Sequence, residues 1–263
     1  MQVFENIITH IDSGIYKIII NRPASHNSLS SGLLIDLKNA INEAEIDSEI
    51  RVIIITAAGE KAFCAGADLK EGFSKGEMVK MSESLKNLYN PVITGIRESK
   101  KPFICALNGI AAGAGSSIAL ACDIIVAADT ASLSQIFIKI GLIPDAGAMY
   151  FLPKLVGNRK AFELFTSGRI VPATECLELG LINEVVSFEK LEERTQAIAE
   201  SYAIAPTIAI GLIKQMINKS NYFSLAEMLN LEAENQDIAS QSKDAAEGIL
   251  AFLQKRKAEF KGK

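Results

Sequence analysis

The sequence predicts an α/β fold with a largely parallel sheet and a helical C-terminal region. Continuous apolar runs lie at 51–57, 102–107 and 123–128, as in strands that are buried on both faces. A glycine turn and a helical stretch separate the second run from the third, which is the order of a strand–helix–strand unit. Beyond residue 173, apolar residues recur mainly at helical spacing.

The chain begins with a predicted β-hairpin. Apolar runs at 3–9 and 15–21 flank Asp12-Ser13-Gly14, where glycine permits a tight turn. Asn21-Arg22-Pro23 ends the second strand, because proline cannot donate a hydrogen bond to a central ladder.

Helical spacing predicts the helices that follow. One helix covers the apolar positions between 33 and 44, with Ser30 or Ser31 as its N-cap. Ser224-Leu225-Ala226-Glu227 is a capping box, and Pro206 suits a first helical turn. The four C-terminal helices are expected at 191–203, 206–218, 224–240 and 243–252.

The length of 263 residues suits one large domain with a helical appendage. Hydrophobic residues make up 49% of the chain and charged residues 22%, which is enough for a sizeable core. We expect a core over residues 1–200 and a helical region over 201–263. The apolar faces of these last helices need covering, for which oligomer contacts are one means.

Composition argues against several classes of protein. The net charge of −4 gives no broad basic surface for nucleic acid. No uncharged apolar run reaches the roughly 18 residues of a membrane span, and the N-terminus is not a signal peptide, so a cytoplasmic enzyme is expected. The cysteines are scattered among apolar residues and are expected to be reduced core residues: Cys64, Cys105, Cys122 and Cys176.

Two stretches of small residues follow predicted strands. In 61–69, Gly66 permits a turn whose amides can face an anion, although a plain tight turn explains this stretch more simply. In 108–117 a strand feeds a helix, whose free N–H groups and dipole favour negative charge; close helix–strand packing explains the same residues. Ile118 stands where the dinucleotide fingerprint needs glycine.

Asp145 is a candidate acid or base. It lies in 140–149, a strongly apolar loop, next to Pro144 and small residues. Such a carboxylate is either a helix N-cap or a functional group. Burial would raise its pKa and make it a better proton acceptor near neutral pH.

Metal and hydrolase sites lack support in the sequence. The two histidines, His10 and His26, are far apart, and metal ligands do not cluster, so no metal site is expected. No serine has an obvious histidine base, and neither a nucleophile elbow nor a P-loop is present, which disfavours a serine hydrolase.

Several motifs together resemble the enoyl-CoA hydratase/isomerase (crotonase) superfamily. They run nearly from end to end, at 21–23, 63–69, 108–123, 141–144, 180–182 and 251–256. The resemblance implies a ClpP/crotonase-like spiral of ββα units. It also implies a homotrimer or a dimer of trimers, with 201–263 as the trimerisation region. The implied substrate is an acyl-CoA thioester, with no separate cofactor.

The resemblance further implies catalytic roles. Backbone N–H groups of Ala67 and Ala114 would hold the thioester oxygen and stabilise the enolate that forms when an α-proton leaves. Family hydratases carry two glutamates at the positions of Ser117 and Phe137, and neither residue is a base. Family isomerases use one carboxylate in the loop of Asp145, which can take a proton from one carbon, return it to another and so shift a double bond.

Four segments resemble, within this family, the ring-1,2-epoxyphenylacetyl-CoA isomerases of phenylacetate degradation: 87–91, 111–115, 137–145 and 211–215. The implied reaction is a double-bond shift or the opening of a ring epoxide in a CoA thioester. The implied CoA contacts are Ala24, Asn27, Ala65, Ala67, Asp68, Leu69 and Lys70, with Phe252 and Lys255 reaching the adenine and phosphate ends from this or a neighbouring subunit. The implied acyl pocket is Leu85, Leu88, Tyr89 and Phe137, for which ordinary core packing is the alternative.

Two other functions stay open. An enoyl-CoA hydratase of broad specificity could use Asp145 alone. A non-catalytic RNA-binding or scaffold relative is the alternative of another class, since a fold does not fix a function. The acidic net charge and the presence of Asp145 argue against that second alternative.

Overall fold

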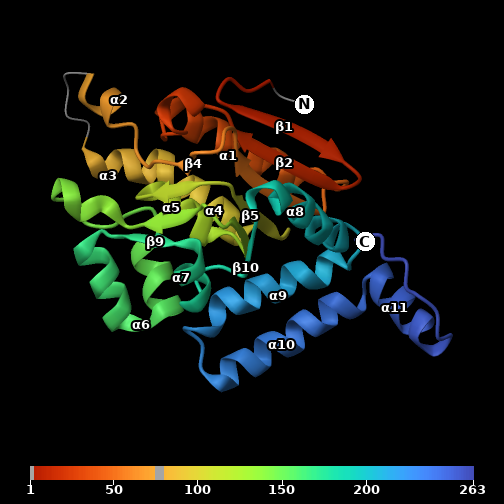
Figure 1. Cartoon of the computed structure of the whole chain (residues 1–263). Helices are drawn as coiled ribbons and strands as arrows, with labels where there is room; N and C mark the ends of the chain where they lie inside the picture. The colour runs from red at the N-terminus through yellow and green to blue at the C-terminus, as the bar shows by residue number, and fades with distance from the viewer. Residues whose placement is uncertain (1–2, 75–79) are drawn as a thin grey trace.

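The computed structural model describes residues 3–74 and 80–263, and two sheets lie at its centre (Figure 1). The larger has the order β1 (Ile7–Asp12), β2 (Ile15–Ile20), β3 (Val52–Ala57), β5 (Phe103–Leu107), β7 (Ile124–Ala128) and β10 (Glu184–Val186). The smaller has the order β4 (Ala62–Cys64), β6 (Ile110–Ala112), β8 (Ser132–Ser134) and β9 (Ile170–Pro172). Pairing is parallel except between β1 and β2 and between β8 and β9, which confirms a largely parallel sheet.

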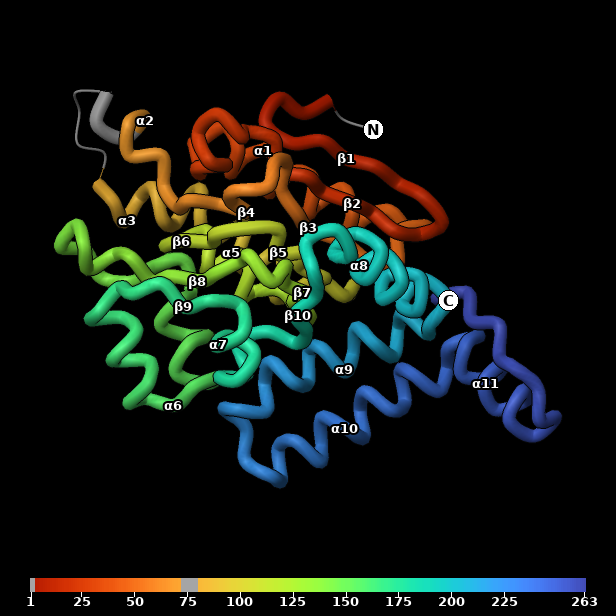
Figure 2. The backbone as a smooth tube through the Cα atoms, viewed as in Figure 1, coloured from red at the N-terminus to blue at the C-terminus, as the bar shows by residue number. Residues whose placement is uncertain are grey.

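The chain moves repeatedly from the larger sheet to the smaller one. Each of β3, β5 and β7 is followed directly by a short strand, β4, β6 or β8, and then by helical segments. Successive units therefore add one strand to each sheet, so both sheets grow in parallel along the molecule (Figure 2). This repetition confirms the predicted spiral of ββα units.

The helices and helical turns surround these sheets. They are η1 (Pro23–Ser25), α1 (Ser31–Ile46), α2 (Leu69–Ser74), α3 (Met81–Ser84), the π-helical turn η2 (Leu85–Tyr89), α4 (Asn90–Glu98), α5 (Ala114–Ala121), η3 (Ile136–Ile140), α6 (Ala148–Ser167), α7 (Ala173–Glu178), α8 (Phe188–Ala203), α9 (Thr207–Ser220), α10 (Leu225–Ser240) and α11 (Lys243–Leu253). Ser30 is the N-cap of α1, because its hydroxyl accepts from Leu33 N. The capping box of α10 is also present.

Some boundaries and elements differ from those that the sequence predicts. The first strand begins at Ile7 rather than at residue 3, and it extends to Asp12, so that the turn is confined to Ser13 and Gly14 at positive φ. The helix α6 was not predicted, because Pro153 lies inside it and Gly157 interrupts it with φ 76° and ψ 161°.

The core lies around the larger sheet. Helix α8 packs against β2, β3, β5 and β7, and α1 and α4 pack against each other. Tyr16, Phe63 and Phe103 are fully buried. All four cysteines are free and buried, as expected of small core residues.

Helices α10 and α11 extend away from the sheets, and α9 lies between α10 and the core (Figures 1 and 2). Helix α9 is fixed to the core by Lys214, whose ammonium donates to the carbonyl oxygens of Ile96 (2.7 Å) and Lys101 (3.0 Å) and pairs with Asp123. Over the described part of the chain, no single helix is long and apolar enough to cross a membrane; α8 and α9 reach that limit only as a pair bent by 107°.

Candidate active site

Two backbone segments meet where the parallel strands β4 and β6 end. A Cβ atom on Gly66 would lie 2.9 Å from the carbonyl oxygen of Ala112, and one on Gly115 would lie 2.7 Å from Cys64 Sγ. Only glycine permits so close an approach at these two positions. The packing brings the chain at Ala67 beside the chain at Ala114.

Ala67 and Ala114 both carry backbone N–H groups that have no acceptor among residues 3–74 and 80–263. Ala114 is the first residue of α5, where N–H groups have no intrahelical partner. Gly113 precedes it with φ 54° and donates to Ser134 O, so the turn into the helix is fixed. Two free donors on adjacent segments can hold one anionic oxygen.

Asp145 lies in the loop before α6. Its Oδ1 atom is buried without a hydrogen-bond partner in the described structure. Burial raises the pKa of this carboxyl to about 6. The helix begins only at Ala148, with Gly147 as N-cap and no side-chain cap bond, so the N-cap interpretation of Asp145 is wrong.

Ser117 connects the Asp145 loop to α5. Its hydroxyl donates to the carbonyl oxygen of Asp145 at 3.2 Å, and its side chain is fully buried. Phe137 is also buried, and its ring lies 3.7 Å from a Cβ built on Gly113. The sequence singles out Ser117 only because it stands at the position of a hydratase glutamate. No sequence pattern predicts that its hydroxyl holds the Asp145 loop.

Three of the four predicted acyl-pocket residues lie together in one helical turn. Leu85, Leu88 and Tyr89 lie in the π-helical turn, an irregularity that is frequent at functional sites. All three are half-buried, and Leu88 and Tyr89 pack against the core. Burial first, and then the charge of Asp145, raises the pKa of the Tyr89 hydroxyl well above its usual value.

The predicted CoA contacts divide into exposed residues and residues that bond within the fold. Ala65 N donates to the carbonyl oxygen of His26 at 3.1 Å, which joins the segment at 24–27 to the one that follows β4. The exposed predicted contacts on these two segments are Ala24, Ala65, Ala67, Leu69 and Lys70. Each of these five residues is therefore accessible to a ligand in the single chain.

Asn27 instead stabilises the fold. Its amide donates to the carbonyl oxygens of Ala58 (3.0 Å) and Ala62 (2.8 Å), and its oxygen accepts from Arg22 N. Only 1% of the residue is exposed. The side chain therefore has no group left for CoA, and any contribution of Asn27 to binding is through the loop that it shapes.

Asp68 also has partners within the fold. Its carboxylate accepts from Arg22 Nη2 at 3.0 Å and from Ser28 Oγ at 3.1 Å. Burial opposes ionisation, but these hydrogen bonds outweigh it and hold the pKa of Asp68 below its usual value. Sequence reasoning missed Arg22 as the residue that fixes this loop, although it stands in the Asn21-Arg22-Pro23 motif.

Phe252 and Lys255 lie elsewhere in the chain. They belong to α11 and its end, at the opposite side of the molecule from α2 (Figure 1). Phe252 is 82% exposed, and Lys255 has φ 55°. The single chain does not bring these two residues to the other predicted contacts, so their contact with CoA stays a prediction that requires a second subunit.

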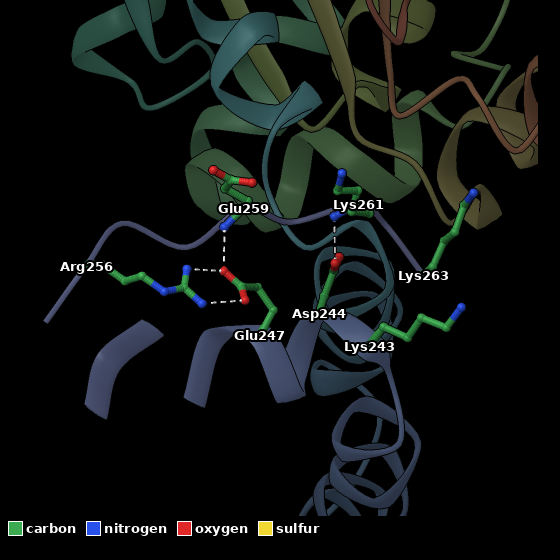
Figure 3. Close-up of a pocket in the computed structure, with 7 residues that line it drawn as sticks. All are labelled: Lys243, Asp244, Glu247, Arg256, Glu259, Lys261 and Lys263. Carbon is green, nitrogen blue, oxygen red and sulfur yellow. Dashed lines mark hydrogen bonds and ion pairs between the residues drawn. The ribbon is translucent and has the colours of Figure 1, made fainter. Parts of the chain in front are cut away.

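A hollow of about 630 Å³ lies beside α11 and the C-terminal tail, and Asp145 is not among the residues that line it (Figure 3). Arg256 and Glu247 form a two-pronged ion pair across it, with distances of 2.6 and 2.8 Å. Asp244 is buried and accepts from the backbone N–H groups of Lys261 and Gly262. These groups are used to attach the tail to α11, and they do not form a reactive cluster.

Comparison with known proteins identifies the family of this chain. The family model described as enoyl-CoA hydratase/isomerase matches residues 10–263. The 1,2-epoxyphenylacetyl-CoA isomerase of Escherichia coli K12 is 38% identical, over 99% of this chain and 100% of that protein. The short-chain-enoyl-CoA hydratase of Clostridium acetobutylicum is 34% identical, over 97% of each.

Solved structures give the same result. A crystal structure of an enoyl-CoA hydratase from Bacillus anthracis has a TM-score of 0.93 and 37% identity, and the match covers 98% of this chain and 100% of that one. A structure from Geobacillus kaustophilus HTA426 has a TM-score of 0.92 and 33% identity, over 99% of each chain. With its matching fold and a family match over nearly its whole length, this chain belongs to the enoyl-CoA hydratase/isomerase family and has the crotonase fold.

Proposed function

We propose that this protein is an acyl-CoA isomerase in which Asp145 moves a proton between two carbons of the acyl group. The observation that carries the proposal is the half-buried carboxylate of Asp145, with Oδ1 free of any hydrogen bond in the described structure and a pKa raised to about 6. An isomerase among the similar proteins supports it. The phenylacetate pathway is suggested by that relative alone.

The chemistry needs one base and one oxyanion site. The ionised Asp145 takes a proton from the carbon next to the thioester, and the electron pair moves onto the thioester oxygen. The N–H groups of Ala67 and Ala114 stabilise that oxygen. In other enzymes, one such donor lowers the activation free energy by about 2.7–4 kcal/mol. The protonated Asp145 then returns the proton to a carbon further along the chain, and the double bond has moved.

A pKa near 6 suits both halves of this cycle. A base that is ionised at neutral pH but not strongly acidic can accept a proton and release it again. Because only the ionised form starts the reaction, we expect kcat/KM to rise with pH and to level off above about pH 6.

The test is the substitution Asp145→Asn, assayed with a cis-3-enoyl-CoA and with aromatic acyl-CoA thioesters, with products identified by mass and NMR. We expect double-bond transfer to fall by about 10³-fold, since a positioned acid or base contributes roughly 10²–10⁴. The affinity for CoA thioesters should stay within about twofold. The matched control is Asp237→Asn on the exposed surface of α10, and turnover that survives in Asp145→Asn would exclude the mechanism.

Hydration of a double bond is the second candidate, because hydratases are also among the similar proteins. Ser117 and Phe137 stand where the resemblance places the two hydratase glutamates, and both are buried and neither is a base. Water addition to crotonyl-CoA, measured beside double-bond transfer, distinguishes the two activities. Faster hydration than isomerisation would make the hydratase the main activity.

A further inference from the structure

The turn that follows Asp145 has a strained backbone. Ala146 (φ 48°) and Gly147 (φ 84°) are both at positive φ, as in a type I′ turn. Ala148 N closes the turn by donating to the carbonyl oxygen of Asp145 at 3.0 Å. Alanine rarely adopts a left-handed conformation, because its Cβ crowds the backbone. Such a conformation persists only where the surrounding structure holds it, and Ala146 is indeed buried.

Ser117 supplies one of the restraints on this turn. Its hydroxyl donates to the Asp145 carbonyl oxygen at 3.2 Å, while its other acceptor, Gly113 O, is farther away at 3.5 Å. Together with Ala148 N–H, the hydroxyl occupies both lone pairs of the Asp145 carbonyl. That carbonyl lies in the same rigid plane as the Cα atom of Asp145. The two hydrogen bonds therefore restrict the direction in which the Asp145 side chain leaves the backbone.

The Asp145 carboxylate depends on this backbone support. Its Oδ1 atom is buried, and no hydrogen bond holds that atom within the described residues. Ser117 also lies three residues after Ala114 on α5, and residues at that spacing are neighbours on one face of a helix. One short helix thus carries a free backbone donor at its start and the support of the carboxylate one turn later.

We infer that Ser117 is a positioning residue, whose hydroxyl sets the place of the Asp145 carboxylate relative to the Ala114 N–H. A base and an oxyanion donor act on the same acyl group, and an error near 1 Å in their separation can lower a rate by about 10²-fold. Ser117 is fully buried and its proton is used by the carbonyl, so it acts through Asp145. The inference rests on the proposed function for the role of Asp145 as the base.

A double-mutant cycle tests the inference. Wild type, Ser117→Ala, Asp145→Asn and the double variant are assayed for double-bond transfer in a cis-3-enoyl-CoA. We expect Ser117→Ala to lower kcat about tenfold and to keep KM within about twofold, because the groups that bind the substrate remain. In the Asp145→Asn background the same substitution should change the residual kcat by less than about twofold, because the group that Ser117 positions is already lost.

Two outcomes of the cycle would overturn the inference. One is a kcat in Ser117→Ala equal to that of wild type. The other is a tenfold loss in both backgrounds, which would mean that Ser117 supports the fold in general and not Asp145 in particular. The variant should fold, because the Asp145 carbonyl keeps its hydrogen bond from Ala148 N.

Ser116→Ala is the matched control. Ser116 is the preceding residue of α5 and is equally buried, but its hydroxyl accepts from Gln135 Nε2 at 3.0 Å. Its loss should lower the stability and leave kcat within about twofold. Hydrogen exchange followed by mass spectrometry adds a readout that does not depend on activity. Peptides that cover 145–149 should exchange faster in Ser117→Ala than in Ser116→Ala or wild type, and equal exchange in all three would contradict the role of Ser117.

The same samples separate this inference from the proposed function. Full turnover in Asp145→Asn contradicts the isomerase proposal, whatever Ser117→Ala does. Turnover that is lost in Asp145→Asn and unchanged in Ser117→Ala supports the proposed base and refutes the role of Ser117.

Discussion

At the scale of single residues, Asp145 combines a chemical role with a cost in stability. Its pKa in the folded protein, about 6, is above the usual value near 4, so the folded state binds the proton more tightly than the unfolded chain does. Ionisation at neutral pH therefore destabilises the fold. That cost disappears as the pH falls from about 6 to about 4.

We accordingly expect Asp145→Asn to be more stable than wild type at pH 7. Burial of the ionised carboxylate should cost about 1 kcal/mol at pH 7, because the side chain is only partly buried and water still screens its charge. Urea unfolding at pH 7 and at pH 4.5 measures the difference, which should shrink at the lower pH. Asp237→Asn should show no such trend, and an Asp145→Asn protein that is less stable at pH 7 would contradict the argument.

Sequence alone could name Asp145 but could not choose between its two roles. An acid three residues before a helix and one at its N-cap look alike in sequence, and only the observed start of α6 at Ala148 separates them. The resemblance supplied Ala67 and Ala114 as donors. Asn27 and Asp68 were predicted to contact CoA, but their side chains bond to distant segments of the fold. Local sequence does not predict such long-range hydrogen bonds.

At the scale of elements, the start of α5 depends on its contact with the end of β4. We expect Gly115→Ala to push these segments apart, because the new Cβ would lie 2.7 Å from both Cβ and Sγ of Cys64. Overpacking should cost about 1–3 kcal/mol of stability. A displacement near 1 Å between the Ala67 and Ala114 donors should lower kcat/KM by about 10²-fold.

The matched control for this prediction is Gly32→Ala. It adds the same atom to a helix, α1, where the nearest atom is the end of the Asn6 side chain at 3.2 Å. Enzyme assays and thermal unfolding of both variants give the comparison. Full activity in a folded Gly115→Ala protein would show that the close contact does not set the donor geometry.

Elements differ in how well their sequences predict them. Continuous apolar runs predict β3, β5 and β7, and helical periodicity predicts the C-terminal helices α8 to α11. All of these elements are present. The strands β4, β6, β8 and β9 have three residues each, too few for a periodic signal. They form through pairing between distant parts of the chain, which local sequence does not encode.

At the scale of the whole molecule, local sequence does not predict which surface covers the C-terminal helices. The apolar faces of the last helices predict a need for cover, and Ile249, Phe252 and Leu253 on α11 are indeed largely exposed in the single chain. Which surface covers them, and whether a second subunit brings Lys255 to CoA, depends on contacts between chains. Trimer formation therefore stays a prediction, which sedimentation analysis can test.

Attachment of the C-terminal helices to the core can be tested within one chain. Lys214 on α9 is 6% exposed and reaches through to Asp123 at 2.7 Å, beside the first residue of β7. Burial lowers the pKa of this ammonium, while the charge of Asp123 opposes the change. Removing one partner of a buried pair leaves the other without compensation.

We expect Lys214→Met to destabilise the protein by about 3 kcal/mol, at the lower end for such pairs because Phe103 N and Arg97 still contact Asp123. Lys219→Met is the matched control, since it makes the same exchange at an exposed position of α9. Urea unfolding followed by circular dichroism compares the two. Since the polar contacts of Lys214 are with Asp123, Ile96 and Lys101 and not with the Asp145 loop, the folded variant should keep its kcat. Equal stability of both variants would mean that apolar packing alone holds α9 to the core.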